Sequence, residues 1–154
     1  MEVIFRTAPS SPSFGFIRFS TKRMHHGAGD FKCLATADVD GQEHAVDLDM
    51  IGPYRDDMLG FFEDMGRYWR GWSGVMSWES EFAELSLAAR NPGGGDVAVD
   101  VLMRWPPIDE NTWSGSLSLR AHELPRAADA MRKLMGGESG GRFLTPGPQT
   151  WQPL

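Results

Sequence analysis

The stretch from residue 43 to residue 69, EHAVDLDMIGPYRDDMLGFFEDMGRYW, contains the change of pattern that decides the fold. In residues 43–51 the apolar Val46, Leu48 and Met50 alternate with polar side chains, which is the period of a half-buried strand. From residue 53 the apolar side chains recur at helical spacing instead, at positions 54, 58, 61, 62, 65 and 69. The stretch therefore predicts a strand followed directly by one long helix over residues 53 to about 69.

Alternating apolar and polar side chains also occur on both sides of this stretch, so strands precede and follow the predicted helix. These further candidate strands cover residues 2–6, 14–20, 30–38, 85–89, 97–105 and 113–120. Asp40-Gly41 is a strong signal for a two-residue hairpin, and a second helix is expected from about residue 125 to 135, capped by Gly136. The sequence predicts an α+β fold: a curved antiparallel sheet of about seven to eight strands with two helices, the longer inserted mid-chain.

The length of 154 residues fits one domain. We expect a single α+β domain over residues 1–135 and an irregular tail over residues 136–154, because the tail holds five glycines and three prolines. Phe143, Leu144 and Trp151 are the tail side chains expected to dock onto the domain.

Composition narrows the class of function. The net charge of −6 argues against general nucleic-acid binding, which needs a basic surface. No apolar run approaches the roughly 18 residues of a membrane span, and the first residues do not resemble a secretory signal. The single cysteine, Cys33, excludes an internal disulfide framework. We therefore expect a soluble cytoplasmic protein that binds neither nucleic acid nor membrane, and composition leaves its oligomeric state open.

Residues that could carry catalysis do not form a recognisable motif. His25 and His26 are adjacent in a loop, and no cysteine or carboxylate at ligand spacing completes a metal site. Cys33 lies on the apolar side of a predicted strand, where a thiol is usually inert. The Gly93–Gly95 run joins strand to strand, so it offers no helix N-terminus to a phosphate. We expect no catalytic residue, no metal and no cofactor.

Acidic residues are concentrated in residues 38–57, which hold seven acidic side chains and one basic one, a net charge of −6. Such a stretch attracts cations or a basic protein surface, although a solubilising face is the plainer alternative. A calcium loop at residues 38–41 lacks the later bidentate glutamate. We place the centre of a partner site at Asp47 and Asp49, which share the wet face of one strand. Its expected rim is Asp38, Glu43, Asp56 and Asp57.

Tryptophans mark the place where the long helix should meet the following strands. Trp69, Gly71, Trp72 and Trp78 predict a structural joint, in which large rings fill the core and the glycine permits a sharp bend. An exposed tryptophan that anchors a partner is the alternative.

These residues also carry a resemblance. The segments WRGWSG (69–74), SWES (77–80), ELSLAA (84–89) and DVAVDV (96–101), with the Trp113 strand and the short helix after it, resemble a family of small bacterial domains of unknown function. That family is similar to the WapI-like immunity proteins, which neutralise partner toxins. The resemblance covers about residues 45–135 and implies a binding role without catalytic residues.

Three hypotheses of function follow. The first is a non-enzymatic protein-binding domain, an immunity-type antitoxin that covers a basic, toxin-like partner with its acidic face. The second is a small-molecule binder or enzyme with a pocket between helix and sheet, near the loops at residues 22–30 and 106–112. The third is a subunit of a larger assembly that docks through its tail.

Overall fold

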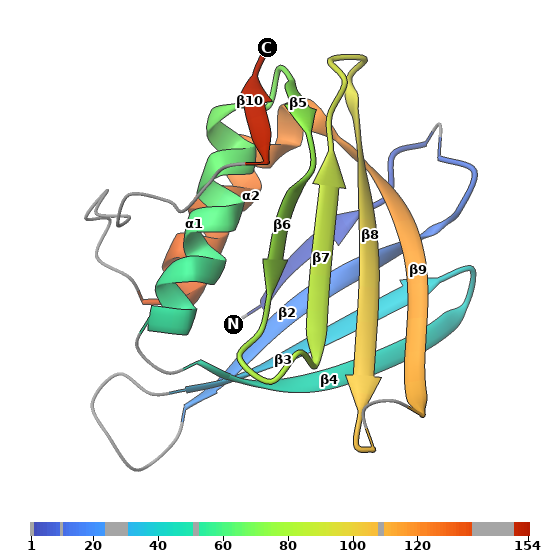
Figure 1. The fold of residues 1–154 in the computed structure, drawn as a ribbon, viewed down its shortest axis with the longest axis vertical. Coiled ribbons are helices and arrows are strands. Elements are labelled where there is room, and N and C mark those ends of the chain that lie inside the picture. The colour runs from blue at the N-terminus through green and yellow to red at the C-terminus, as the bar shows by residue number, and fades with distance from the viewer. Residues whose placement is uncertain (1, 10, 24–30, 51–52, 108–109, 137–149) are drawn as a thin grey trace.

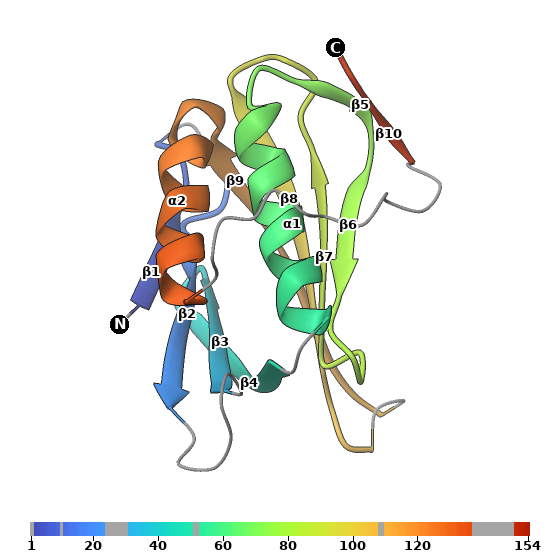
Figure 2. The ribbon, with the colours of Figure 1, turned by 90° about the vertical axis from the view of Figure 1, so that its left-hand side faces the viewer.

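The computed structural model describes residues 2–9, 11–23, 31–50, 53–107, 110–136 and 150–154. Within them, ten antiparallel strands form two four-stranded sheets and one two-stranded pair, and two α-helices lie along one side of the sheets (Figures 1 and 2). The predicted α+β class with two helices is confirmed. The strands are more numerous than the expected seven to eight, because the tail and the residues around the tryptophan joint also contribute strands.

The first sheet contains the strands that precede the long helix, in sequence order. Its members are β1 (Glu2–Arg6), β2 (Gly15–Arg23), β3 (Phe31–Val39) and β4 (Gln42–Met50). Asp40 and Gly41 connect β3 to β4 with φ angles of 54° and 85°, as a two-residue hairpin turn requires. The hairpin fixes the register of β4, so Val46 and Leu48 are buried while Asp47 and Asp49 face outward.

The second sheet contains the strands that follow the long helix, also in sequence order. Its members are β6 (Met76–Glu79), β7 (Leu85–Arg90), β8 (Asp96–Trp105) and β9 (Asn111–Arg120). The two sheets meet just after β1, where Thr7 pairs with Leu119 and the Ala8 N–H donates to the Ser118 carbonyl at 2.7 Å. The sequence predicts these strands as one curved sheet, and the structure divides them between two sheets that are joined at this bridge.

The helices pack against each other and cover the side of the fold between the two sheets (Figure 2). Helix α1 runs over Pro53–Arg67, and α2 runs over Leu124–Leu134 after the 3₁₀ turn η1 (Ala121–Glu123). Gly66 permits the close approach, because a Cβ there would lie 3.0 Å from the Ala128 Cβ. Across the helix pair, Arg132 Nε donates to Glu63 Oε1 at 2.9 Å, which compensates the burial of that carboxylate.

Aromatic rings from both sheet and helix fill the space beneath α1. Phe62 of α1 stacks on Phe5 of β1 at 5.1 Å between ring centroids, and it meets Phe19 of β2 edge-on at 5.5 Å. Such pairs contribute roughly 0.5–1.5 kcal/mol beyond the burial of their area. The amphipathic pattern that predicts α1 is thus the pattern that joins the helix to the first sheet.

Asn91, between β7 and β8, ties the end of α1 to the second sheet. Its side-chain Nδ2 donates to the Trp69 carbonyl at 2.7 Å, and its backbone carbonyl accepts from the Trp72 N–H at 2.9 Å. Its Oδ1 also accepts from the Gly93 N–H at 3.1 Å, which shapes the turn before β8. Asn91 itself is 1% exposed, so losing the bond to Trp69 would leave its buried amide group without a partner.

Gly71 lies where three segments come together. Its φ of 144° disfavours any residue with a side chain, and a Cβ there would collide with the Leu154 side chain and approach the Gly93 Cα to 3.1 Å. The Leu154 N–H donates to the Gly71 carbonyl at 3.3 Å. The bend that the sequence assigns to Gly71 is therefore also the docking point of the last residue.

The tail departs from its predicted irregularity at residues 151–153. These residues form β10 (Trp151–Pro153), which pairs with β5 (Trp72–Gly74), and Trp151 is buried against Tyr68 with 5.0 Å between their ring centroids. A three-residue strand inside a segment rich in glycine and proline leaves no alternation to detect. Trp151 docks as expected, whereas Phe143 and Leu144 lie outside the described residues.

Trp72 should contribute far more to stability than Trp69, because Trp72 is 1% exposed while Trp69 is half-buried. Replacing Trp72 with Ala should lower the free energy of unfolding by about 3–5 kcal/mol, the usual cost of emptying a large core site. Trp69→Ala is the matched control and should cost clearly less. Urea unfolding of both variants measures the difference, and an equal or larger loss for Trp69→Ala would contradict this account of the joint.

Candidate functional site

Asp47 and Asp49 project from the outward face of β4, and both are exposed. Their cross-strand neighbours on β3 are Leu34 and Lys32. The Lys32 Nζ lies 4.0 Å from Asp49 Oδ1, with both side chains about half exposed, so this pair is weak. Asp47 has no ion pair or hydrogen bond within the described part of the chain. Most of the charge on this face is therefore available to an external group.

The other four acidic residues of the expected site lie at the two ends of β4. Asp38 and Glu43 are cross-strand neighbours beside the hairpin turn, where Asp38 Oδ1 accepts from the Gly41 N–H at 3.1 Å. Asp56 and Asp57 lie near the start of α1, after the far end of β4. Glu43 and Asp49 are six positions apart, a distance of roughly 20 Å along a strand. The six carboxylates therefore follow β4 and its two ends as a line, and the structure does not gather them into one pocket.

Each end of this line has a local use for its charge. Asp56 lies in the first turn of α1, where the helix dipole favours an acid, and its Oδ1 lies 3.7 Å from Arg55 Nε. Partial burial, together with the nearby charge of Asp56, raises the pKa of Asp57. Asp38 serves the hairpin turn. The centre of the line, at Asp47 and Asp49, is the part that these local roles leave unexplained.

The position of β4 in its sheet supplies a structural role that the sequence does not reveal. Among the described residues, β4 is the last strand of the first sheet, and no further strand of that sheet covers its outer edge. Trp105 Nε1 donates to the Ala45 carbonyl at 2.8 Å and occupies part of that edge. Charged side chains on an edge strand discourage pairing with another chain. Asp47 and Asp49 thus protect the edge as well as charging it.

The predicted tryptophan joint lies where α1 meets the second sheet. Trp72 and Trp78 are 1% and 8% exposed, and the Trp72 Nε1 donates to the Ala89 carbonyl at 3.3 Å. Trp69 is half-buried, and the Arg70 guanidinium lies 5.1 Å from its ring centroid. These rings fill the core, and Trp72 and Trp78 offer almost no surface to a partner.

The candidate nucleophile and the histidines are placed as follows. Burial raises the pKa of the Cys33 thiol to about 12, because the thiolate cannot be solvated inside the sheet. His44 stacks on Trp113 with 4.5 Å between ring centroids, and His122 is exposed. His25 and His26 lie outside the described residues. Within the described part of the chain, no three His, Cys, Asp or Glu side chains come together as metal ligands.

A shallow hollow of about 870 Å³ lies on the outer face of the second sheet. Its lining is dominated by small side chains, including Ser77, Ser86, Ala88, Ser114, Gly115 and Ser116. The charged groups of this face bind one another: Asp100 Oδ2 accepts from Arg90 at 2.9 Å, and its Oδ1 accepts from Ser116 at 2.7 Å. Glu79 likewise accepts from the Ser86 hydroxyl at 3.0 Å, so both charged residues of the lining are already paired within the sheet.

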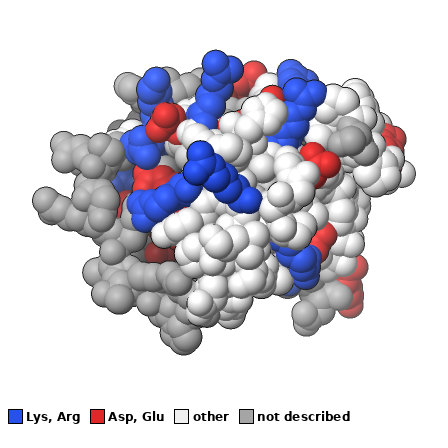
Figure 3. All heavy atoms as spheres, turned by 90° about the horizontal axis from the view of Figure 1, so that it is seen from above, with Lys and Arg blue, Asp and Glu red and all other residues white. Residues whose placement is uncertain are grey.

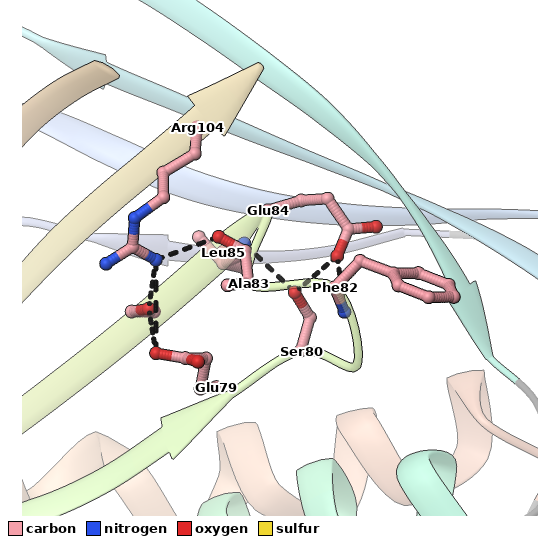
Figure 4. A network of polar contacts seen from close by, with 8 residues as sticks. Glu79, Ser80, Phe82, Ala83, Glu84, Leu85 and Arg104 are labelled. Atoms are coloured by element: carbon pink, nitrogen blue, oxygen red, sulfur yellow. Dashed lines mark hydrogen bonds and ion pairs between the residues drawn. The ribbon is translucent and has the colours of Figure 1, made fainter. Parts of the chain in front are cut away.

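The turn between β6 and β7 is held by a network that sequence reasoning missed (Figure 4). Glu84 Oε1 accepts from the Ser80 hydroxyl at 2.9 Å and from the Phe82 N–H at 3.0 Å. Arg104 of β8 donates to the Ala83 carbonyl at 2.8 Å, and Ala83 has a φ of 60°. The network holds Phe82 at the tip with 59% of its surface exposed. Ser80 belongs to the SWES segment and Glu84 to the ELSLAA segment. Their hydrogen bond forms only because the turn brings the two side chains together, and the sequence pattern does not show this.

One groove in the structure partly matches the predicted pocket between helix and sheet. A groove of about 350 Å³ lies between β1 and the beginning of α2, away from the 106–112 loop named in that hypothesis. Residues 24–30 and 108–109, which belong to the expected loops, lie outside the described residues. The hypothesis of a docking tail meets a different arrangement, because β10 pairs with β5 of its own domain.

Comparison with known proteins identifies a family and nothing closer. A model described as a family of unknown function (DUF6228) matches residues 8–138, from just after β1 to just beyond α2. Neither the curated proteins nor the solved structures yield a match. The family description names no activity, and it carries no link to immunity proteins. Among the described residues, no helix is long and apolar enough to cross a membrane.

Cys33 should be almost unreactive in the folded protein. Raising its pKa from 9.0 to about 12 lowers the thiolate fraction about 1000-fold near pH 8, and burial also blocks the reagent. Labelling with an aromatic disulfide reagent should therefore be at least about 100-fold slower in buffer than in denaturant. Rapid labelling without denaturant would show that β3 opens or that the thiol is accessible.

Asp100 should make stability depend on pH. Its hydrogen bond from Ser116, and then the interactions with Arg90, lower the pKa of Asp100 below its usual value of 3.8. A carboxylate with a lowered folded-state pKa stabilises the fold above its unfolded-state pKa, and this contribution disappears as pH falls through the folded-state value. Asp100→Asn should thus be less stable than the parent at pH 7, and the two should converge below about pH 4. Urea unfolding across pH measures this, with Asp47→Asn as the unbonded control. A gap independent of pH would contradict it.

Proposed function

We propose that this chain, which belongs to the DUF6228 family of unknown function, is a non-enzymatic protein-binding domain that meets a basic partner through β4. The observation that carries the proposal is the exposure of Asp47 and Asp49 on one face of an edge strand. Asp47 has no ionic partner among the described residues, and the single partner of Asp49 lies at the limit of an ion pair.

Electrostatics explains what such a strand would do. Glu43, Asp47 and Asp49 share the outward face of β4, and further carboxylates lie beyond both of its ends. A line of like charge raises the rate of encounter with an oppositely charged surface, and salt weakens that effect. It also disfavours the pairing of acidic or neutral strands with the edge. A basic protein is therefore the partner class that this surface accepts best.

An immunity-type role is the specific form that we propose. Asp47 and Asp49 are two residues apart on an extended strand, so their Cα atoms lie roughly 6.6 Å from each other. Nucleic-acid strands also carry regularly spaced negative charge, with about one phosphate per 3.4 Å of rise. A strand with this charge pattern would occupy the basic cleft of a nuclease-like toxin and exclude its substrate. The tryptophan segment resembles a family of small bacterial domains, and the similarity that we infer between that family and the WapI-like immunity proteins is the further support.

The available nucleophile and carboxylates favour binding over catalysis. Cys33 is buried with a raised pKa, so it is a poor nucleophile at neutral pH. Asp100 is held by Ser116 and Arg90, and Glu63 by Arg132. These groups contribute to folding through bonds that a substrate would have to break.

The test measures the association rate constant between this chain and the protein encoded by the neighbouring gene, at several salt concentrations. Asp47→Lys should lower the association rate constant about tenfold at low salt and flatten its salt dependence. Glu110→Lys is the matched control, because it makes the same change of charge at another exposed position and should alter the rate less than about twofold.

The outcomes separate the parts of the proposal. If Asp47→Lys and Glu110→Lys lower the rate equally, the strand is not the contact surface and only net charge matters. If the parent chain does not bind the neighbouring product at all, the immunity role is wrong.

A further inference from the structure

The groove between β1 and α2, named here the β1–α2 groove, is lined by residues of four elements. Glu2 to Arg6 of β1 form one wall, and Leu119 and Arg120 of β9 lie at one end. Glu123 of η1 and the first turns of α2 form the other wall. The volume of about 350 Å³ is at the lower end of the range for small-molecule sites.

The floor of the β1–α2 groove is apolar. Ile4 on the β1 wall and Ala127 and Ala130 on the α2 wall are half-buried and line the inside of the groove. Buried Val3, Phe5 and Leu124 also contribute to its lining and connect it to the core. A ligand with a short hydrocarbon part would bury apolar surface here at little cost, because alanine side chains leave the space open.

Three arginines surround this floor. Arg6, Arg120 and Arg126 all line the groove, although the chain as a whole carries a net charge of −6. The two glutamates of the groove already face other guanidinium groups: Glu2 lies 3.9 Å from Arg18, and Glu123 lies 3.6 Å from Arg120. Within the described part of the chain, Arg6 and Arg126 have no carboxylate at ion-pair distance. Two exposed guanidinium groups therefore remain for an anion.

The wider surface around α2 supports the same sign of ligand. Figure 3 views the molecule from above, at the end where α1 stops and α2 starts, and several Lys and Arg side chains project from that otherwise mostly uncharged face. Arg120 and Arg126 belong to elements that meet at this end (Figure 1). A surface of this charge attracts anions over several ångströms before contact.

Backbone groups of β1 also face the groove. The Thr7 N–H donates to Gly15 of β2 at 3.1 Å, whereas the Ala8 N–H donates to Ser118 of β9 at 2.7 Å. Because backbone direction alternates along a strand, the amide groups of Arg6 and Ile4 point to the same side as Ala8, away from β2. The strand edge thus adds backbone donors to the two guanidinium groups.

We propose that the β1–α2 groove binds a small amphipathic anion, a carboxylate or phosphate monoester joined to a short apolar chain. Arg6 and Arg126 bind the anionic group, since a guanidinium matches either anion with paired N–H donors. Ile4, Ala127 and Ala130 receive the apolar part. The proposal does not depend on the acidic strand, because β4 lies at the opposite edge of the first sheet from β1.

The probes are octanoate and octyl phosphate, with octanol and octylamine as the neutral and cationic controls, titrated by calorimetry up to about 10 mM. Both anions should bind, and Arg6→Gln with Arg126→Gln should weaken them about tenfold or more. Arg70→Gln with Arg90→Gln is the matched control outside the groove and should leave binding unchanged. Ala127→Trp should abolish binding by filling the floor while the charges stay in place.

A cooperative thermal unfolding transition confirms that each variant is folded. If a variant does not fold, the single variant Arg126→Gln is used in its place. The proposal is overturned if neither anion binds, if octanol binds as tightly as octanoate, or if the double glutamine variant in the groove binds normally. Inorganic phosphate is titrated as the last probe, because it carries the anionic group without an apolar chain. Equal affinity for phosphate and octyl phosphate would show that the apolar floor takes no part, and it would overturn the amphipathic assignment.

Discussion

The fold depends on the hydrogen bonds that Asn91 makes to the residues on both sides of Gly71; we call this set of bonds the Asn91 bracket. Helix α1 has no extended loop after it, so its last residues must turn directly into the second sheet. Asn91 makes this possible by bonding the Trp69 carbonyl with its side chain and the Trp72 N–H with its backbone. The bracket brings Gly71 against Gly93, which leaves room for Leu154 and for the pairing of β10 with β5. The helix, the second sheet and the tail are thus aligned by one buried amide.

Much of this architecture could be predicted because period and burial agree. The alternation of Val46 and Leu48 with Asp47 and Asp49 predicts the exposed face of β4, since one buried face determines the register. The change of period at Pro53 predicts α1, and Asp40-Gly41 predicts the hairpin between β3 and β4. The strands that were missed have another origin. β5 and β10 have three residues each and pair across about 80 residues of sequence, so their stability comes from the joint and local pattern carries no sign of them.

The candidate site was less predictable than the fold. The acidic residues are close together in the sequence, which suggested one acidic surface. The two ends of a nine-residue strand lie far apart, however, so the carboxylates are spread along β4 as a line. The edge position of β4 depends on the order of strands in space, and this order cannot be deduced from β4 itself. The arginines of the β1–α2 groove were hidden for the opposite reason. Arg6 lies near the start of the chain and Arg126 far along it, so only folding brings them to one groove.

The junction between the sheets has a consequence for how the chain is made. Thr7 pairs with Leu119, so the residues that close the curve are synthesised more than a hundred residues apart. At about 5–20 residues per second, the ribosome delivers β9 roughly 6–20 seconds after β1. The β1 edge that will face β9 therefore waits without its partner while the intervening strands emerge. A topology with such distant pairing folds slowly, and the β1 to β4 meander is the part that can form first.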